Sequence, residues 1–259
     1  MKALSKVFLI VVLFSALFLL LRFFGAYFDY DVSVLVSDLG GLAYLYSTIG
    51  TVFAMFAAFV VVSESQDWNL LRAAARDEVR DLSEMLSWSK KLSPALAAGF
   101  SGAIEDYLDM VVNKEWKLLS EGAESDETEM IIERFHDLLA DAEKENVEIG
   151  GHLFGLFTEL LNHRSIRVDY SYHPLPNILK FTVTLVAFAV IGLSFFIGVK
   201  NVFLDFIFMA CIVTSGSVIL IVIDDLDNPL RPGEWYLRSD GHQRLLDAIR
   251  RLRSQVRLT

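Results

Sequence analysis

Two apolar runs decide the fold of this chain: ILKFTVTLVAFAVIGLSFFIGV at residues 178–199 and VFLDFIFMACIVTSGSVILIVI at residues 202–223. Each run has 22 residues, and a helix needs about 20 apolar residues to cross the hydrocarbon core of a bilayer. Only Lys200 and Asn201 separate the two runs, and helices joined so tightly must be antiparallel. The stretch therefore predicts a transmembrane hairpin.

Two earlier runs, at about residues 7–28 and 42–62, predict a second hairpin around a short acidic loop with Asp29, Asp31 and Asp38. The first run also has the position of a signal peptide. It is longer than a typical signal core of about 7–15 residues, no A-x-A cleavage pattern follows it, and another apolar run begins soon after. We therefore expect an uncleaved helix and four transmembrane helices in all.

The composition agrees with a membrane protein. The 259 residues are 54% hydrophobic, with a mean hydropathy of +0.44 and 20 Phe, whereas soluble domains are about 45–50% apolar. The single cysteine, Cys211, excludes an intramolecular disulfide and a cysteine metal site. The net charge of −10 argues against nucleic-acid binding, which needs a basic face.

The segment between the hairpins is polar, acidic and helical in pattern. Residues 64–169 carry 23 acidic and 11 basic side chains. Apolar residues recur there at spacings of three and four, which predicts amphipathic helices. The first of these faces consists of Leu71, Ala75, Val79, Leu82 and Leu86.

Capping residues give the expected ends of these helices. Asp67 is a candidate cap for the first helix, and the second is expected to end near Gly122. Asp126, with a Glu three residues later, has the spacing of a capping box for the third, and Ser125 is the alternative cap. A fourth helix is expected after Gly150-Gly151.

Basic flanking residues predict the orientation. Lys2 and Lys6 precede the first helix, and Arg231 and an arginine-rich tail follow the fourth; positive flanks stay in the cytoplasm. The predicted fold is an all-α integral membrane protein of the cell (inner or plasma) membrane with both termini in the cytoplasm. It has a hairpin at 1–63, an acidic helical cytoplasmic domain at 64–176 inserted between the second and third transmembrane helices, a hairpin at 177–224 and a tail at 225–259.

The tail from Ser239 predicts a basic amphipathic helix with Leu245, Ile249 and Leu252 on its apolar face. It either lies on anionic lipid or docks on the acidic domain. The opposite charge within the same molecule favours docking.

Two ionisable residues stand out inside the apolar runs. Arg22 lies in the outer part of the first helix, and Asp205 lies near the outer end of the fourth. An unpaired charge inside a bilayer is costly, so one hypothesis is an Arg22–Asp205 pair at similar depth. The other is that Arg22 snorkels outward and Asp205 reaches the outer headgroups.

The second transmembrane helix has two contrasting faces at 100° per residue. The bulky face holds Ile49, Phe53, Phe56 and Val60, and the neighbouring small-residue face holds Ser47, Gly50, Ala54, Ala57 and Ala58. Small side chains let helices approach closely, so the second face predicts a packing seam. The bulky face either contacts lipid or, where several copies surround an axis, forms a hydrophobic constriction.

Charged residues outside the membrane allow two interpretations each. Asp224, Asp225 and Asp227 follow the fourth helix; they are candidate calcium ligands or are simply solvated or paired with arginine. Arg164 and Arg167 stand three residues apart and therefore share a helix face. They either attract anions toward a pore or neutralise the acidic domain, and neutralisation is the more conservative interpretation.

No residue pattern predicts catalysis. The five histidines lack metal-ligand spacing, and no Ser, Cys or Gly-rich motif suggests a reaction. We expect no enzyme, and no cofactor apart from calcium at the aspartates. A membrane-anchored enzyme is retained as the least favoured class.

Three short motifs resemble the bestrophin-like domain family, bacterial membrane proteins of largely unknown function. They are EW at residues 115–116, LNHRSIR at 161–167 followed by LP at 175–176, and LDNP at 226–229 followed by Gly233. Bestrophins are pentameric anion channels with four transmembrane helices, helical cytoplasmic domains, an apolar neck on the second helix and an acidic calcium-binding segment. The resemblance therefore implies a homo-oligomeric, pentameric channel in the lipid bilayer for small anions such as chloride, with Ile49, Phe53 and Phe56 as its neck.

Two features depart from that family. The aspartates precede Asn228-Pro229, whereas the family's acidic segment follows its Asn-Pro, which weakens the case for calcium gating. The acidic domain would also repel anions from a vestibule. The alternatives are a channel for cations and a non-conducting scaffold or sensor whose acidic domain docks a partner.

Overall fold

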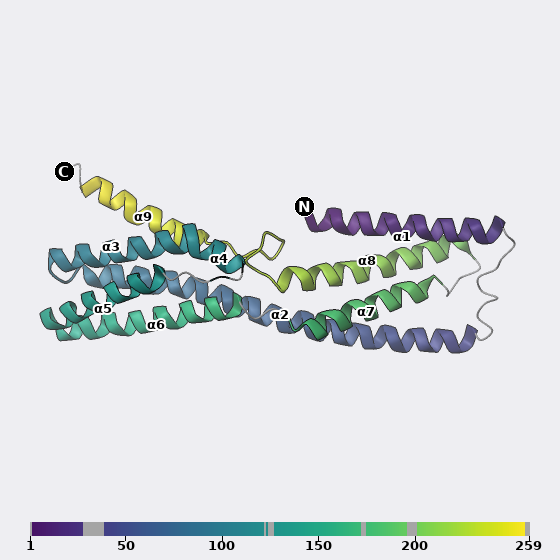
Figure 1. The fold of residues 1–259 in the computed structure, drawn as a ribbon, viewed down its shortest axis with the longest axis horizontal. Coiled ribbons are helices and arrows are strands. Elements are labelled where there is room, and N and C mark those ends of the chain that lie inside the picture. Colours follow the sequence, from purple (N-terminus) through teal and green to yellow (C-terminus); the bar gives the residue numbers. More distant parts are fainter. Residues whose placement is uncertain are drawn as a thin grey trace. The chain divides into compact units, whose positions relative to one another are not determined.

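The computed structural model describes residues 2–27, 39–121, 123, 127–171, 175–195 and 201–256, and every regular element among them is a helix (Figure 1). The chain divides into two compact units, each described here by itself. The membrane unit comprises Met1–Gln66, Leu175–Asp227 and Gly233–Trp235, and the acidic unit comprises Asp67–Pro174, Asn228–Pro232 and Tyr236–Thr259.

Four helices of the membrane unit are long and apolar enough to cross a bilayer, which confirms the four predicted apolar helices. They are α1 (Lys2–Tyr27), the first part of α2 (Leu39–Ser89), α7 (Asn177–Ser194) and α8 (Val202–Leu226). α8 lies beside both α1 and α7. Two clusters form the core of this unit: Phe18, Ile191, Met209 and Val213, and Phe53, Ala57, Val60, Val183, Ala187, Val190 and Ile223, the second with Leu175 at its edge.

The second helix does not end where its apolar run ends. α2 is one helix of 51 residues, and Asp67 lies inside it rather than at an N-cap. No Gly or Pro occurs at residues 51–92, so nothing in the backbone interrupts the helix. Ser65 keeps its hydroxyl within the helix by donating to the Val61 carbonyl at 2.6 Å. The helix end expected near Val62 was therefore wrong: the residues change there from apolar to polar, but the helical conformation continues.

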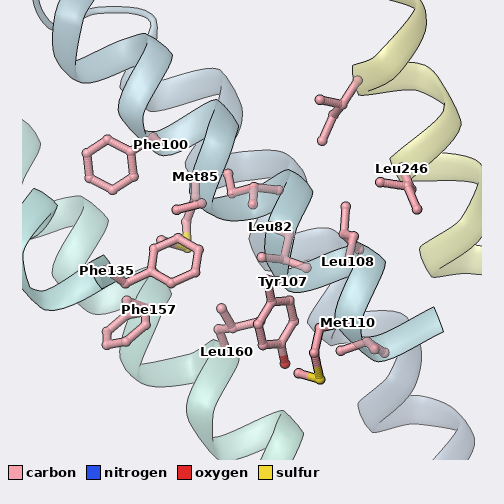
Figure 2. Close-up of a cluster of buried hydrophobic side chains, with 14 of the residues drawn as sticks. Leu82, Met85, Phe100, Tyr107, Leu108, Met110, Phe135, Phe157, Leu160 and Leu246 are labelled. Atoms are coloured by element: carbon pink, nitrogen blue, oxygen red, sulfur yellow. The ribbon is translucent and has the colours of Figure 1, made fainter. Parts of the chain in front are cut away.

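The acidic unit packs its helices around one apolar core. Besides the later part of α2 it contains α3 (Pro94–Met110), the π-helical turn η2 (Val111–Glu115), α4 (Trp116–Ser120), α5 (Glu127–Glu145), α6 (Val147–Ser171) and α9 (Asp240–Val256). α5 lies against α3 and α6, and α9 lies against α3. Figure 2 shows core side chains that include Leu82, Met85, Phe100, Tyr107, Leu108, Phe135, Phe157, Leu160 and Leu246.

α6 begins before the two glycines that were expected to precede it. Asn146 caps the helix, because its side-chain oxygen accepts hydrogen bonds from the backbone N–H groups of Glu148 and Ile149, both at 3.1 Å. Gly150 and Gly151 therefore lie within the first turns of α6. The expected end at Gly122 and the caps Ser125 and Asp126 lie outside the described residues, as do the Asp29–Asp38 loop and Lys200.

The basic tail helix docks on the acidic unit. Arg250 of α9 pairs with Glu105 and Asp109 of α3, and Arg253 pairs with Glu105. Leu246 and Ile249, each four residues before one of these arginines and therefore on the same side of α9, are buried in the core. The structure therefore has the tail helix packed on the acidic unit, which was one of its two expected positions, the other being on anionic lipid.

Gly150 supplies the clearest packing test. A Cβ atom there would lie 2.5 Å from the backbone Cα of Glu143 in α5, whereas one at Gly151 would meet nothing within 4 Å. We predict that Gly150→Ala lowers stability by about 1–3 kcal/mol through overpacking, while Gly151→Ala leaves it unchanged or raises it by up to about 1 kcal/mol. Thermal unfolding of the purified proteins in detergent measures both. Equal midpoints for the two variants would contradict the close α5–α6 approach.

Candidate functional site

One face of α2 is open along the membrane unit. Thr48, Val52, Met55, Phe59 and Val62 follow one another at spacings of four, three, four and three, and all five side chains are exposed. Met55 and Phe59 are 71% and 67% exposed. This 4-3 spacing keeps side chains on one seam of a helix that faces neighbouring helices. We refer to these five residues as the open stripe of α2.

The neck candidates of the sequence analysis lie on a different face. Phe53 is 8% exposed and packs among Val183 and Ala187 of α7. Ile49 and Phe56 are partly buried at the edge of the same cluster. A side chain enclosed by helices of its own subunit contributes to the core of that subunit rather than to a pore wall.

The predicted small-residue face is divided between the core and the surface. Ala57 is 2% exposed, whereas Ser47, Ala54 and Ala58 are exposed. A Cβ atom added at Gly50 would meet nothing within 4 Å. This face and the open stripe lie next to each other. Together they form one broad side of α2 whose side chains, apart from Ala57, are not covered by the described residues of the membrane unit.

The exposed surface of α1 has a different composition. Its exposed residues between Phe8 and Phe24 are large and apolar apart from Ala16, and Phe8, Leu13, Leu20 and Phe23 among them are 52–71% exposed. Large apolar side chains are the ordinary choice for contact with lipid. The broad side of α2 instead combines large apolar residues with alanines and hydroxyl groups.

Arg22 and Asp205 are brought together. An Arg22 nitrogen donates to a carboxylate oxygen of Asp205, so α1 and α8 are joined by an ion pair. Asp205 is 3% exposed, and the Arg22 side chain is 33% exposed. The guanidinium group also lies over the ring of Phe18, 5.5 Å from its centroid.

The three aspartates lie at the end of α8, Asp224 and Asp225 in its last turn and Asp227 directly after it, and each has a partner within the membrane unit. Lys180 of α7 binds Asp224 at 3.1 Å and Asp227 at 2.8 Å, and Asp227 also accepts the backbone N–H of Leu175 at 2.5 Å. Asp225 accepts the backbone N–H of Glu234 at 2.6 Å. Their partners are thus a lysine and backbone amides rather than arginine.

The contact with Asp225 explains why residue 233 is a glycine. A Cβ atom at that position would collide with the carboxylate of Asp225, so the motif glycine lets the chain close over the aspartate. Among the described residues, no three His, Cys, Asp or Glu side chains gather into a group that would hold a metal ion. The calcium hypothesis for Asp224, Asp225 and Asp227 therefore gains no support from their geometry.

A buried ionic cluster forms the polar centre of the acidic unit. Arg167, which has no exposed surface, donates to Glu78 through Nε at 2.8 Å and to Glu115 through Nη2 at 2.7 Å. Arg164 donates to the other oxygen of Glu115 at 2.7 Å. Glu78 and Glu115 are 0% and 1% exposed. Two glutamates and two arginines from α2, η2 and α6 thus neutralise one another inside the protein.

Neighbouring side chains complete this cluster. Tyr107 donates its hydroxyl to Glu78 at 2.6 Å, and the guanidinium group of Arg167 lies over the Trp116 ring at 5.3 Å. His242 of α9 places Nε2 3.5 Å from Glu78 without a hydrogen-bond partner. The cluster therefore joins α2, α3, η2, α4, α6 and α9.

Burial and charge act in opposite directions on these groups, which lie outside the apolar part of α2. Burial alone would raise the pKa of the Glu78 carboxyl, but the charges of Arg167 and His242 outweigh it and hold that pKa well below its ordinary value. Burial and the adjacent Glu78 raise the pKa of Tyr107 well above its ordinary value, so its hydroxyl stays a donor. The pKa of a glutamate in the unfolded chain is about 4.3. The ionised Glu78 therefore stabilises the folded unit fully above that pH, and this contribution is lost as the pH falls from there through the lower pKa of the folded state.

Arg164 and Arg167 have a different role from attracting anions. Both use their charge on carboxylates inside the acidic unit, which corresponds to the neutralisation alternative. The sequence did not single out Glu78, which accepts from Arg167, or Tyr107, which donates to Glu78. The only available signal was the motif pattern itself, because the EW and HRSIR motifs supply Glu115, Trp116, Arg164 and Arg167 to one cluster.

Comparison with known proteins agrees with this geometry. A family model for the Bestrophin-like domain matches residues 7–232. The fold is similar to that of a bacterial bestrophin homologue from Klebsiella pneumoniae with a tyrosine-to-alanine mutation, with a TM-score of 0.70 and 13% identity over 96% of this chain and 98% of that one.

A second solved structure, described as a membrane protein with a proline-to-alanine substitution, has a TM-score of 0.70 and 12% identity over 96% of this chain and 97% of that one. No curated protein matches the chain. At these identities the structural likeness shows the fold alone.

The Arg22–Asp205 contact gives a prediction for a double-mutant cycle. Arg22→Ala removes a cation from the buried Asp205 carboxylate and should cost about 3–5 kcal/mol. Adding Asp205→Ala removes the buried charge as well and should recover part of that loss. Thermal midpoints of the single and double variants in detergent measure the coupling. Equal losses in the Arg22→Ala variant and the double variant would show that the pair is not coupled.

The ionic cluster gives a prediction with an internal control. Arg167→Gln deprives both Glu78 and Glu115 of a cation in a buried site and should lower stability by about 3–5 kcal/mol. Arg134→Gln breaks the exposed Arg134–Asp106 pair, whose side chains are 49% and 56% exposed, and should cost about 1 kcal/mol or less. Chemical or thermal unfolding of both proteins provides the comparison. A similar, small loss in both would mean that Arg167 does not hold the cluster together.

Proposed function

The chain belongs to the Bestrophin-like domain family, and from that premise we propose that several copies assemble into an ion channel in the cell membrane. The observation that carries the proposal is the open stripe of α2. A heptad-spaced stripe that remains exposed within its own subunit suits a helix that faces an axis shared with other copies. By resemblance to bestrophins the assembly is a pentamer.

The character of α2 supports a contact between subunits. Ala54, Ala58 and Gly50 present small surfaces that let a helix of another copy approach closely. Their neighbour Thr51 has its hydroxyl bonded to the Ser47 carbonyl at 2.8 Å, so it presents no unpaired donor to a partner helix. In this arrangement the small-residue face meets the next subunit and the open stripe meets the pore.

The constriction of the pore is placed on Val52, Met55 and Phe59. Rings of such side chains around an axis form a hydrophobic neck that gates by excluding water. The earlier candidates Ile49, Phe53 and Phe56 remain the alternative, but the burial of Phe53 favours the open stripe. Neither arrangement requires calcium, so calcium is not part of the proposal.

Small anions such as chloride are the proposed permeant ions, with the acidic unit and both termini in the cytoplasm. The most buried carboxylates of that unit, Glu78, Asp81 and Glu115, are each bonded to arginine or histidine. They therefore add no uncompensated negative charge against anions. Conduction of cations, and a scaffold without conduction, are the competing outcomes.

Bilayer recordings with cysteine variants test this function. In a Cys211→Ser background, Met55→Cys and Phe59→Cys should make the current sensitive to a charged, membrane-impermeant thiol reagent. Phe53→Cys is the matched control, because its side chain is enclosed by α7 and should not react. Asymmetric chloride salt then gives the permeant ion from the reversal potential.

Each result has a distinct meaning. A reversal potential at the cation limit removes the anion assignment and keeps the channel. Modification at Phe53→Cys alone returns the neck to the bulky face. No current, together with the mass of a monomer or dimer in detergent, rejects the channel and supports the scaffold.

A further inference from the structure

A cavity of about 650 Å³ opens in the acidic unit where the start of α9 meets α2. Its volume falls within the range of about 300–1,000 Å³ that is typical of small-molecule sites. Four arginines line it: Arg72 and Arg76 from α2, Arg238 from the segment before α9, and Arg244 from α9. Asp240 is the one carboxylate among the described lining residues, which leaves an excess of three positive charges.

These four arginines line one cavity, which sets them apart from Arg231 and Arg251, the other described arginines without an ion pair. Within the described part of the chain, no ion pair joins any of the four to a carboxylate, whereas seven other arginines have one. Arg72 lies over the Trp68 ring at 5.1 Å, and Arg244 Nε donates to the backbone carbonyl of Asp240 at 3.1 Å. All four side chains are exposed.

The lack of ion pairs at these four arginines is informative because the unit around them is acidic. The segment at residues 64–169 carries 23 acidic side chains, and α3 draws Arg250 and Arg253 of the same tail helix into ion pairs. The four guanidinium groups around the cavity have no carboxylate in an ion pair with them, and their combined positive potential favours the binding of an anion there.

The chemistry of the hollow selects the anion. A guanidinium group is a planar fork that matches phosphate oxygens in pairs, and four such forks suit several oxygens spread over a ligand. The first turn of α9 borders the cavity and has backbone N–H groups without partners inside the helix. Ala75, Val79 and Leu245 form apolar parts of its wall.

We propose that this cavity binds a phosphate-bearing anion with two or more negative charges. Such a group comes either from a soluble compound with linked phosphates or from the headgroup of an anionic phospholipid. A single halide ion is too small to contact four guanidinium groups spread around a cavity of about 650 Å³. The site is separate from the open stripe of α2, so this inference stands whether or not the protein conducts ions.

Calorimetric titration of the full-length protein in an uncharged detergent tests the proposal. The soluble probe is inorganic pyrophosphate. The lipid probe is dihexanoyl phosphatidic acid, whose phosphomonoester carries two negative charges when fully ionised, with dihexanoyl phosphatidylcholine as its zwitterionic control. We expect pyrophosphate or phosphatidic acid to bind, and the Arg72→Gln/Arg76→Gln and Arg238→Gln/Arg244→Gln pairs each to weaken it by about tenfold or more. The probe that binds identifies the source of the phosphate.

Arg251→Gln is the matched control, because Arg251 is an exposed arginine of α9 that does not line the cavity. It should leave the affinity within about twofold of the unmodified protein, since loss of one distant charge changes only the diffuse field. Unchanged thermal midpoints without ligand show that the double variants are folded. The proposal fails if neither probe binds, if both double variants bind like the unmodified protein, or if Arg251→Gln weakens binding as much as they do.

Discussion

The acidic unit depends on one requirement: the guanidinium charge of Arg167, which has no contact with water, must be neutralised inside the protein. Glu78 and Glu115 meet it from two helices that are far apart in the sequence. Glu115 ends a π-helical turn, an irregularity often found where a side chain has a special role. Any packing that separates these helices leaves buried charges without partners, so the cluster specifies one arrangement even where its net contribution to stability is small.

Much of the fold was predictable because its signals are local. Four runs of about 20 apolar residues have few alternatives to membrane helices, and the spacings of three and four identified core residues such as Leu71 and Leu82. The continuity of α2 was not predictable in the same way. A change from apolar to charged residues after Val62 resembles a helix end, but only a backbone signal such as Gly or Pro makes one, and none is present there.

The candidate sites also differ in whether a local sequence signal reveals them. Arg22 and Asp205 were open to prediction because charges are rare in apolar runs, so few pairings exist. Glu78 was not, because it is one of 23 acidic side chains at residues 64–169 and nothing local distinguishes a buried carboxylate from a solvated one. The arginine-lined cavity was hidden for a related reason: Arg72 and Arg238 are far apart in the sequence, and their lack of partners exists only in three dimensions.

The two faces of α2 show why burial decides what sequence periodicity cannot. Phe53 and Phe59 are chemically identical, yet the first is 8% exposed and the second 67% exposed. Exposed hydroxyl groups alone do not separate a lipid face from a protein face, because Thr48 satisfies its hydroxyl on the Tyr44 carbonyl of its own helix. Small residues do separate them. Ala54 and Ala58 gain little from contact with lipid but allow a second helix to approach, whereas the exposed positions of α1 between Phe8 and Phe24 carry large apolar side chains with the one exception of Ala16.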